Sequence, residues 1–212
     1  MLQDKDYVNP YLVIKSLHDY CPDAYVATDV GQHQMWTTQF LEMNEKKKLV
    51  TSGGLGTMGY GFPGAIGAQL GNPDATVISI NGDGGFQMNI QEFATAVIQK
   101  LPLILCVFNN SYLGMVRQWQ KLFYGRRYSM TDLCPAEEGS MEPPKYRPDF
   151  VKLAESYGAY GIRVEKEDIA GAFEEAKTHK NAPTLIEFII DAEELVYPMI
   201  KPGGTLEEML LS

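Results

Sequence analysis

The chain alternates between short apolar runs that end in polar clusters and longer stretches with helical spacing. The apolar runs cover residues 24–30, 75–80, 101–108 and 183–190. Because these runs are apolar on both faces, they are typical of central strands in a parallel sheet that helices cover. The helical stretches lie between them, which gives an alternating order of strands and helices. We therefore expect an α/β fold, with a doubly wound, mainly parallel sheet and helices on both faces.

The helical stretches carry recognisable start and stop signals. Asn9 and Pro10 are typical of an N-cap and a first helical position, and they predict a helix that runs to about Tyr20. Similar reasoning predicts helices over residues 61–70, 86–100, 148–157 and 169–178.

The same reading gives one domain with an extension. We expect residues 1–190 to form the domain and residues 191–212, which contain prolines and glycines, to form a C-terminal arm. Within the domain, residues 130–147 are rich in Pro and Glu and have no periodicity, which predicts a surface loop or lid.

Composition narrows the class of protein. The 212 residues are 45% hydrophobic and 21% charged, which is enough to build a core. Their net charge of −9 disfavours binding to nucleic acid or an anionic membrane. No apolar stretch is long enough to cross a bilayer, and no signal-peptide core begins the chain. Three cysteines, Cys21, Cys106 and Cys134, lie far apart in the sequence and have no CxxC spacing. This pattern argues against a disulfide scaffold or a zinc site and fits a reducing compartment. We expect a cytoplasmic protein.

Two polar clusters follow predicted strands. Asp83 lies between Gly82 and Gly84, and Asn109 and Asn110 end the next run. The intervening residues suffice for a helix and a return strand, which would bring Asp83 and Asn110 side by side at the edge where ligands bind. Their oxygens suit Mg²⁺ or Ca²⁺. Each cluster alone is also typical of an ordinary turn or loop.

The spacing from Gly-Asp-Gly to Asn-Asn resembles the thiamine diphosphate motif, which begins with GDG and ends with NN. The resemblance extends over most of the chain to acetolactate synthase, also called acetohydroxyacid synthase. It matches the C-terminal diphosphate-binding domain of the large, catalytic subunit. The segments that carry it are residues 30–36, 51–69, 81–96, 109–120, 147–159 and 196–204.

This resemblance implies a cofactor site for thiamine diphosphate and Mg²⁺. The metal ligands would be Asp83, Asn110 and the backbone carbonyl of Tyr112, and Gln32 and His33 would donate to the diphosphate. The full set of implied cofactor residues is Gly31, Gln32, His33, Gly56, Met58, Gly82, Asp83, Gly84, Gly85, Asn110, Tyr112, Leu113, Gly114 and Met115.

Two residues would shape the reaction pocket. The resemblance implies that Met58 wedges beneath the cofactor, whose 4′-amino group donates to the Gly56 carbonyl, and that Trp119 lines the place where the second substrate is chosen. Ordinary core packing is the alternative for both Met58 and Trp119. Arg117 could meet a substrate carboxylate, but a solvated helix face is the preferred interpretation.

The activity implied is decarboxylation of pyruvate and ligation of the two-carbon unit to a second 2-oxo acid. The product would be 2-acetolactate or 2-aceto-2-hydroxybutyrate, for branched-chain amino acid biosynthesis. Family members also have a pyrimidine-binding domain, which carries the catalytic glutamate, and a middle domain, which carries FAD in the anabolic enzymes. No residue here matches that glutamate, so we expect these residues alone to be inactive and to associate as a homo-oligomer or with the other domains.

Three alternatives remain open at this point. One is another thiamine diphosphate-dependent 2-oxo acid decarboxylase or oxidase, and another is a non-catalytic binding module that keeps the fold. The third is a dinucleotide-binding dehydrogenase, because residues 54–59 fit G-x-G-x-x-G. Its ribose-binding acid would be Asp74, which lies in a turn that contains a proline.

Overall fold

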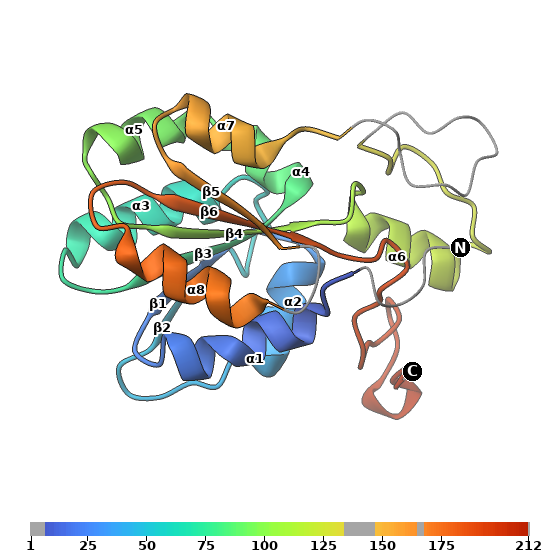
Figure 1. Ribbon diagram of the computed structural model, residues 1–212. Coiled ribbons are helices and arrows are strands. Elements are labelled where there is room, and N and C mark those ends of the chain that lie inside the picture. The colour runs from blue at the N-terminus through green and yellow to red at the C-terminus, as the bar shows by residue number, and fades with distance from the viewer. Residues whose placement is uncertain (1–6, 134–146, 165–167, 212) are drawn as a thin grey trace.

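The computed structural model describes residues 7–133, 147–164 and 168–211 (Figure 1). Its centre is a six-stranded sheet in which every neighbouring pair is parallel. In spatial order the strands are β2 (Lys48–Thr51), β1 (Tyr25–Thr28), β3 (Val77–Gly82), β4 (Ile104–Asn109), β6 (Thr184–Ile189) and β5 (Tyr160–Val164).

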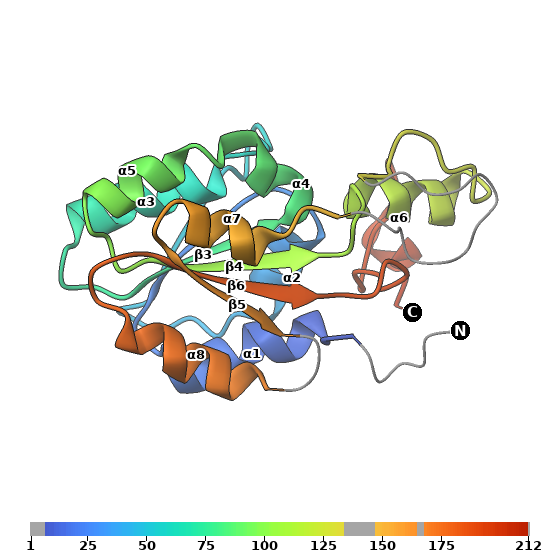
Figure 2. The same cartoon turned by 45° about the horizontal axis from the view of Figure 1, so that its top comes forward.

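Helices cover both faces of this sheet (Figures 1 and 2). One core cluster packs under α1 (Pro10–Tyr20), α2 (Gln32–Phe40) and α8 (Ile169–Thr178). The other packs under α3 (Gly61–Gly71), α4 (Asp83–Phe86), α5 (Glu92–Ile98) and α7 (Phe150–Ser156). The doubly wound α/β fold is therefore confirmed.

Local signals explain several boundaries. The Asn9 side chain accepts a hydrogen bond from the Tyr11 amide at 2.9 Å, so the predicted N-cap of α1 is confirmed. Asp149 caps α7 in the same manner, accepting from the Lys152 amide at 3.2 Å. Gly158 follows that helix with a φ of 84°, a left-handed conformation that suits glycine.

One predicted helix is divided in the structure. The sequence predicts a continuous helix over residues 86–100, but α4 ends at Phe86 and a 3₁₀ turn, η1 (Gln87–Asn89), separates it from α5. The chain already turns into a helix at Asp83, so the short α4 belongs to the strand end rather than to the long amphipathic stretch. That early start places Asp83 in the first turn of a helix.

The two edge strands, β2 and β5, are absent from the predicted strands. Both are partly exposed, whereas every residue of β4 and β6 is buried. A half-exposed strand of four or five residues lacks the continuous apolar run that marks a central strand.

Helix α6 (Gly114–Phe123) lies beyond the carboxyl ends of the strands, next to the C-terminal segment (Figure 2). Residues 191–211, here called the C-terminal arm, contain a short 3₁₀ helix, η2 (Leu206–Glu208), and an isolated bridge between Met199 and Leu210. Of the predicted loop 130–147, residues 134–146 lie outside the described residues.

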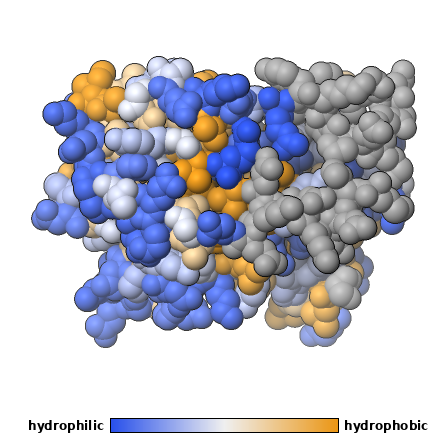
Figure 3. Space-filling view, viewed as in Figure 1, coloured by the Kyte–Doolittle hydropathy of each residue, from blue (hydrophilic) through white to orange (hydrophobic). Residues whose placement is uncertain are grey.

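The surface of the face seen in Figure 1 is mostly hydrophilic, and apolar residues gather near its middle (Figure 3). Across the described part of the chain, no helix is both long and apolar enough to cross a lipid bilayer. Cys21 and Cys106 are buried free thiols, and Cys134 lies outside the described residues.

Candidate functional site

A cavity of about 290 Å³ opens at the carboxyl ends of β1, β3 and β4. Strand order reverses there, because the chain leaves β1 toward β2 on one side and leaves β3 toward β4 on the other. Such a switch point is where open α/β sheets bind ligands. Every residue in the set predicted to bind the cofactor, from Gly31 to Met115, lines this cavity. Trp119 is not among the lining residues.

Asp83 is the buried acid of the cavity, with 4% of its surface exposed. Burial raises the pKa of its carboxyl group to about 7, although hydrogen bonds from the Gly84 and Ser111 amides oppose the shift. The Ser111 amide donates to Asp83 Oδ2 at 2.9 Å. No Lys or Arg within the described ranges forms an ion pair with Asp83. A bound cation would supply the compensating charge, so the carboxylate fits a metal site.

Asn110 faces the same cavity from the neighbouring strand. Its Oδ1 accepts from the Tyr112 amide at 3.1 Å, and its Nδ2 donates to Gln32 Oε1 at 3.3 Å. Ser111 lies between Asn110 and Tyr112 with a left-handed φ of 64°, which turns the chain sharply after β4. The structure thus brings together the carboxylate and the amide that the sequence predicted to share one ion. Oxygen donors of this kind could hold a hard divalent cation.

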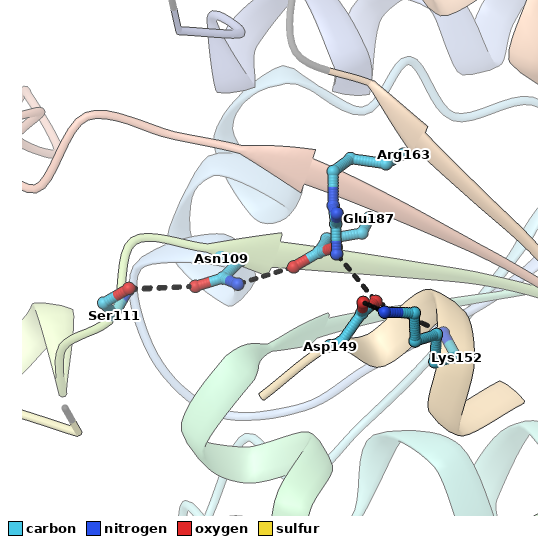
Figure 4. A network of polar contacts seen from close by, with 6 residues as sticks. All are labelled: Asn109, Ser111, Asp149, Lys152, Arg163 and Glu187. Atoms are coloured by element: carbon cyan, nitrogen blue, oxygen red, sulfur yellow. Dashed lines mark hydrogen bonds and ion pairs between the residues drawn. The ribbon is translucent and has the colours of Figure 1, made fainter. Parts of the chain in front are cut away.

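Asn109 points away from the cavity and is 1% exposed. Figure 4 shows its amide between Ser111 and the buried acid Glu187. Asn109 Nδ2 donates to Glu187 Oε1 at 2.6 Å, and its Oδ1 accepts from the Ser111 amide at 3.1 Å. Glu187 Oε2 accepts from Arg163 Nε at 2.7 Å, and Arg163 Nη2 donates to Asp149 at 2.8 Å. We call these five residues the charged network.

His33 closes the side of the cavity between β1 and β3. It is buried, and burial lowers the pKa of its imidazole to about 3, so the ring is neutral near pH 7. Its Nε2 accepts from the Gly82 amide at 3.2 Å, which leaves Nδ1 as the protonated nitrogen. A hydrogen bond to the Asp29 backbone opposes the lowering of the pKa. A Cβ on Gly82 would lie 2.9 Å from the His33 ring, so that glycine allows the ring to approach the strand.

Gln32 was predicted to donate to a diphosphate, but its side-chain amide donates to protein atoms in the structure. Its Nε2 donates to Gln118 Oε1 at 2.8 Å and to the Glu194 carbonyl at 2.9 Å. Both protons of this amide therefore have protein acceptors, while Oε1 faces Asn110. The role of Gln32 toward a diphosphate stays a prediction. Sequence reasoning missed Gln118, which is a buried polar residue inside a helix and carries no motif of its own.

Asp29 is a second residue that sequence reasoning missed. It follows β1, is fully buried and accepts hydrogen bonds from the amides of Val30 and Gly59. Burial raises the pKa of its carboxyl group, and these amide donors oppose the rise. The contact with Gly59 holds the glycine-rich loop, which carries Gly56 and Met58, against the end of β1. An acid directly after an apolar strand was the available signal.

Arg117 differs from its expected surroundings, and Trp119 lies outside the cavity. The sequence placed Arg117 on a solvated helix face, but its side chain is only 15% exposed. Its guanidinium lies over the rings of Tyr112 and Tyr128 and forms an ion pair with Glu193 at 2.6 Å. Trp119 packs edge-on against Phe123 outside the cavity, with a ring separation of 5.9 Å. Its part in substrate choice stays a prediction.

The structure argues against a dinucleotide-binding dehydrogenase, because the acid that would bind the ribose does not lie at the cavity. Asp74 lies before the start of β3, at the amino end of the sheet, whereas the cavity lies at the carboxyl end. Asp74 therefore cannot bind a ribose in the same cavity as the glycine-rich loop.

Comparison with known proteins agrees with this geometry. The family described as thiamine pyrophosphate enzyme, C-terminal TPP binding domain, matches residues 29–188. The chain belongs to this family. Thiamine pyrophosphate is another name for thiamine diphosphate, so the cofactor class predicted from the GDG and NN elements is confirmed.

Individual relatives of this TPP-binding domain are acetolactate synthases. The chain is 43% identical to one from Mycobacterium leprae over 98% of its own length and 32% of the relative's. It is 41% identical to the isozyme 2 large subunit of Escherichia coli K12, over 97% of this chain and 36% of that one. The chain therefore spans about a third of these curated relatives.

A solved structure shares the fold. The thiamine diphosphate-dependent 4-hydroxybenzoylformate decarboxylase of Rhodococcus jostii RHA1 superposes with a TM-score of 0.76 at 27% identity. The superposition covers 90% of this chain and 34% of the decarboxylase chain.

Proposed function

We propose that this chain is the cofactor-binding part of an acetolactate synthase large subunit. The whole enzyme would decarboxylate pyruvate and join the two-carbon unit to a second 2-oxo acid, in branched-chain amino acid biosynthesis. The observation that carries the proposal is the convergence of Asp83 and Asn110 on one cavity from neighbouring strand ends. Similarity to acetolactate synthases over nearly the whole chain supports it.

In this proposal Asp83, Asn110 and the Tyr112 carbonyl would hold Mg²⁺, which would supply positive charge for the diphosphate. The buried carboxylate would stay ionised beside the cation. His33 would line the diphosphate site, where the backbone amides in the first turn of α2 would donate to phosphate oxygens. Thiamine diphosphate, when bound, supplies a nucleophilic carbon and takes up the electrons released with CO₂.

The remaining residues would orient the cofactor and exclude water. The Gly56 carbonyl would accept from its 4′-amino group, and Met58 would support its bent shape, since Met adapts to irregular gaps. Leu113 and Met115 present apolar surface in the same cavity, which supports contacts with the cofactor rings. Trp119 would limit the size of the second substrate from the next turn of α6.

The catalytic glutamate would come from a pyrimidine-binding domain, and FAD would occupy a middle domain. Leu55 and Met130 are 94% exposed, and half-exposed Val116 lines the cavity. Burial of these exposed apolar side chains against a partner would be favourable, which supports a homo-oligomer or a complex with those domains. We place the protein in the cytoplasm, because the free thiols of Cys21 and Cys106 suit a reducing compartment.

The first test is binding rather than turnover. Thiamine diphosphate should bind the 212-residue chain in a Mg²⁺-dependent manner. Loss of a residue that only supports a metal ligand lowers metal affinity by about tenfold or more. Asp83→Asn changes a proposed ligand itself, so it should lower the affinity for thiamine diphosphate by more than about tenfold. Asp74→Asn, the same change at the opposite end of the sheet, should have no effect. Equal binding by Asp83→Asn and the wild type would contradict the metal assignment.

A second candidate function is another thiamine diphosphate-dependent decarboxylase, which the likeness to the Rhodococcus decarboxylase favours. Analysis of the products from pyruvate, with a pyrimidine-binding partner added, separates the two. Acetolactate supports ligation, whereas acetaldehyde or acetyl phosphate indicates a decarboxylase or oxidase. Release of no CO₂ despite cofactor binding indicates a binding module. The chain alone should turn over nothing.

A further inference from the structure

Gln118 connects the C-terminal arm to the proposed metal site. It projects from α6, is 1% exposed, and pairs with the backbone of Val196 in the arm. Gln118 Nε2 donates to the Val196 carbonyl at 3.0 Å, and Gln118 Oε1 accepts from the Val196 amide at 2.9 Å. This double contact fixes which side of the amide carries oxygen. A flipped amide would place its NH₂ group against the Val196 N–H and its oxygen against the Val196 carbonyl.

The orientation of Gln118 determines that of Gln32. With Gln118 Oε1 held toward the cavity side, it can only accept, and Gln32 Nε2 donates to it at 2.8 Å. The second proton of Gln32 Nε2 goes to the Glu194 carbonyl, again in the arm. Gln32 is 5% exposed, so the loss of these bonds could not be offset by bulk water.

Gln32 and the Tyr112 backbone together orient Asn110. Gln32 Oε1 faces Asn110 Nδ2 at 3.3 Å, and Asn110 Oδ1 accepts from the Tyr112 amide at 3.1 Å. Oδ1 keeps a second lone pair, which is available for a metal. Gly114 makes room for the contact between Gln32 and Asn110. A Cβ at that position would overlap Gln32 Oε1 and lie 2.7 Å from Asn110 Nδ2. The sequence therefore has a glycine where the two amides meet.

We propose that the C-terminal arm sets the metal-binding orientation of Asn110 through these three amides, with Gln118 and Gln32 as positioning residues. We call Gln118, Gln32 and Asn110 the amide relay. The inference rests on the proposed function, since it assumes that Asn110 Oδ1 binds Mg²⁺. It also couples the position of the C-terminal arm to Mg²⁺ affinity, because displacement of the arm would release Gln118 and weaken the metal site.

Fastening of the arm can be separated from the relay. Lys121, on the same helix, forms an ion pair with Glu193 of the arm at 2.7 Å but takes no part in the relay. A variant at Lys121 therefore loosens the same two segments without changing any amide. If Gln118 only attached the arm, variants at Gln118 and Lys121 would affect metal binding alike.

The experiment is a titration of the 212-residue chain with Mg²⁺ in excess thiamine diphosphate. Isothermal titration calorimetry measures the Mg²⁺ affinity. Gln118→Met keeps the side-chain size and removes the amide, and it should weaken Mg²⁺ binding by about tenfold, as outer-shell ligand partners do. Lys121→Met should change it by less than about twofold, since partly exposed ion pairs contribute little. Gln118→Asn, which is too short to reach both neighbours, should resemble Gln118→Met and serves if that variant does not fold.

The outcomes separate the two proposals. Wild-type Mg²⁺ affinity in folded Gln118→Met or Gln118→Asn would overturn the relay while leaving the proposed function intact. An equal loss in Lys121→Met and the Gln118 variants would also overturn it, in favour of simple attachment. A wild-type chain that binds no Mg²⁺ with thiamine diphosphate would refute the proposed function and the relay with it.

Discussion

Asn109 and Asn110 are adjacent in sequence but serve two different regions. Asn109 turns into the charged network behind the sheet edge, where buried Glu187 meets Arg163. Asn110 turns into the cavity and is held by neutral amides. The first region contains a buried charge that needs its partner, so removing that partner destabilises the fold. The second contains hydrogen bonds of modest energy, and in our proposal they orient Asn110 toward the metal.

The comparison predicts that the two regions respond differently to mutation. Damage to the charged network should lower the free energy of unfolding and leave the metal affinity of the folded protein nearly unchanged. Damage to the amide relay should lower Mg²⁺ affinity in the folded protein, in addition to the stability lost when buried polar groups are left without partners. Stability and Mg²⁺ affinity therefore need to be measured on the same variants.

The largest effect is expected for Arg163→Met. It leaves the Glu187 carboxylate fully buried without its cation, which should lower the free energy of unfolding by about 3 kcal/mol. Urea denaturation measures this loss. Lys152→Met is the control, because the Lys152 side chain is 81% exposed in its ion pair with Asp149. Its loss should cost less than about 0.5 kcal/mol. Similar losses in the two variants would contradict the distinction between buried and surface charges.

Next in size is Gly114→Ala. The added methyl group would displace Gln32 from Asn110. Mg²⁺ affinity should therefore fall about tenfold, equivalent to about 1.4 kcal/mol. Gly67→Ala is the matched control, since a Cβ on that exposed residue of α3 meets nothing within 4 Å. Isothermal titration with Mg²⁺ and thiamine diphosphate compares the two variants. Unchanged affinity in Gly114→Ala would show that the contact between Gln32 and Asn110 does not orient the ligand.

The smallest effect is expected for Asp149→Asn, which retains a helix cap and removes a charge. Burial alone would raise the pKa of Asp149, but the Lys152 amide and Arg163 hold it below the ordinary value. A depressed folded-state pKa stabilises the fold above the unfolded value, near 4, and this contribution disappears as pH falls through the folded value. Wild type should exceed the variant by less than about 1 kcal/mol at pH 7, and the difference should shrink as pH falls below the unfolded value, measured by urea denaturation. A difference that stays constant or grows as pH falls would contradict this origin.

The sequence predicted those features that continuous patterns encode. β4 and β6 are buried along their whole length, so their apolar runs were visible, and the GDG and NN elements located Asp83 and Asn110. β2 and β5 were not visible, because edge strands bury too little to be uniformly apolar.

The residues that support the site could not be predicted from the sequence, for a different reason. Gln118 and Glu187 act through partners that are distant in sequence, Val196 and Asn109. Nothing local distinguishes Gln118 from a solvated glutamine, or shows that Glu187, inside an apolar strand, has a paired charge. Contacts of this kind follow from topology rather than from spacing.

The central claim is that Asp83 and Asn110 bind one divalent ion. Anomalous diffraction from crystals of the chain grown with Mn²⁺ and thiamine diphosphate tests it directly. We predict a single peak within about 2.5 Å of an Asp83 carboxylate oxygen and of Asn110 Oδ1, the range of oxygen–metal bonds. A peak that contacts neither residue, or only one of them, would contradict the claim.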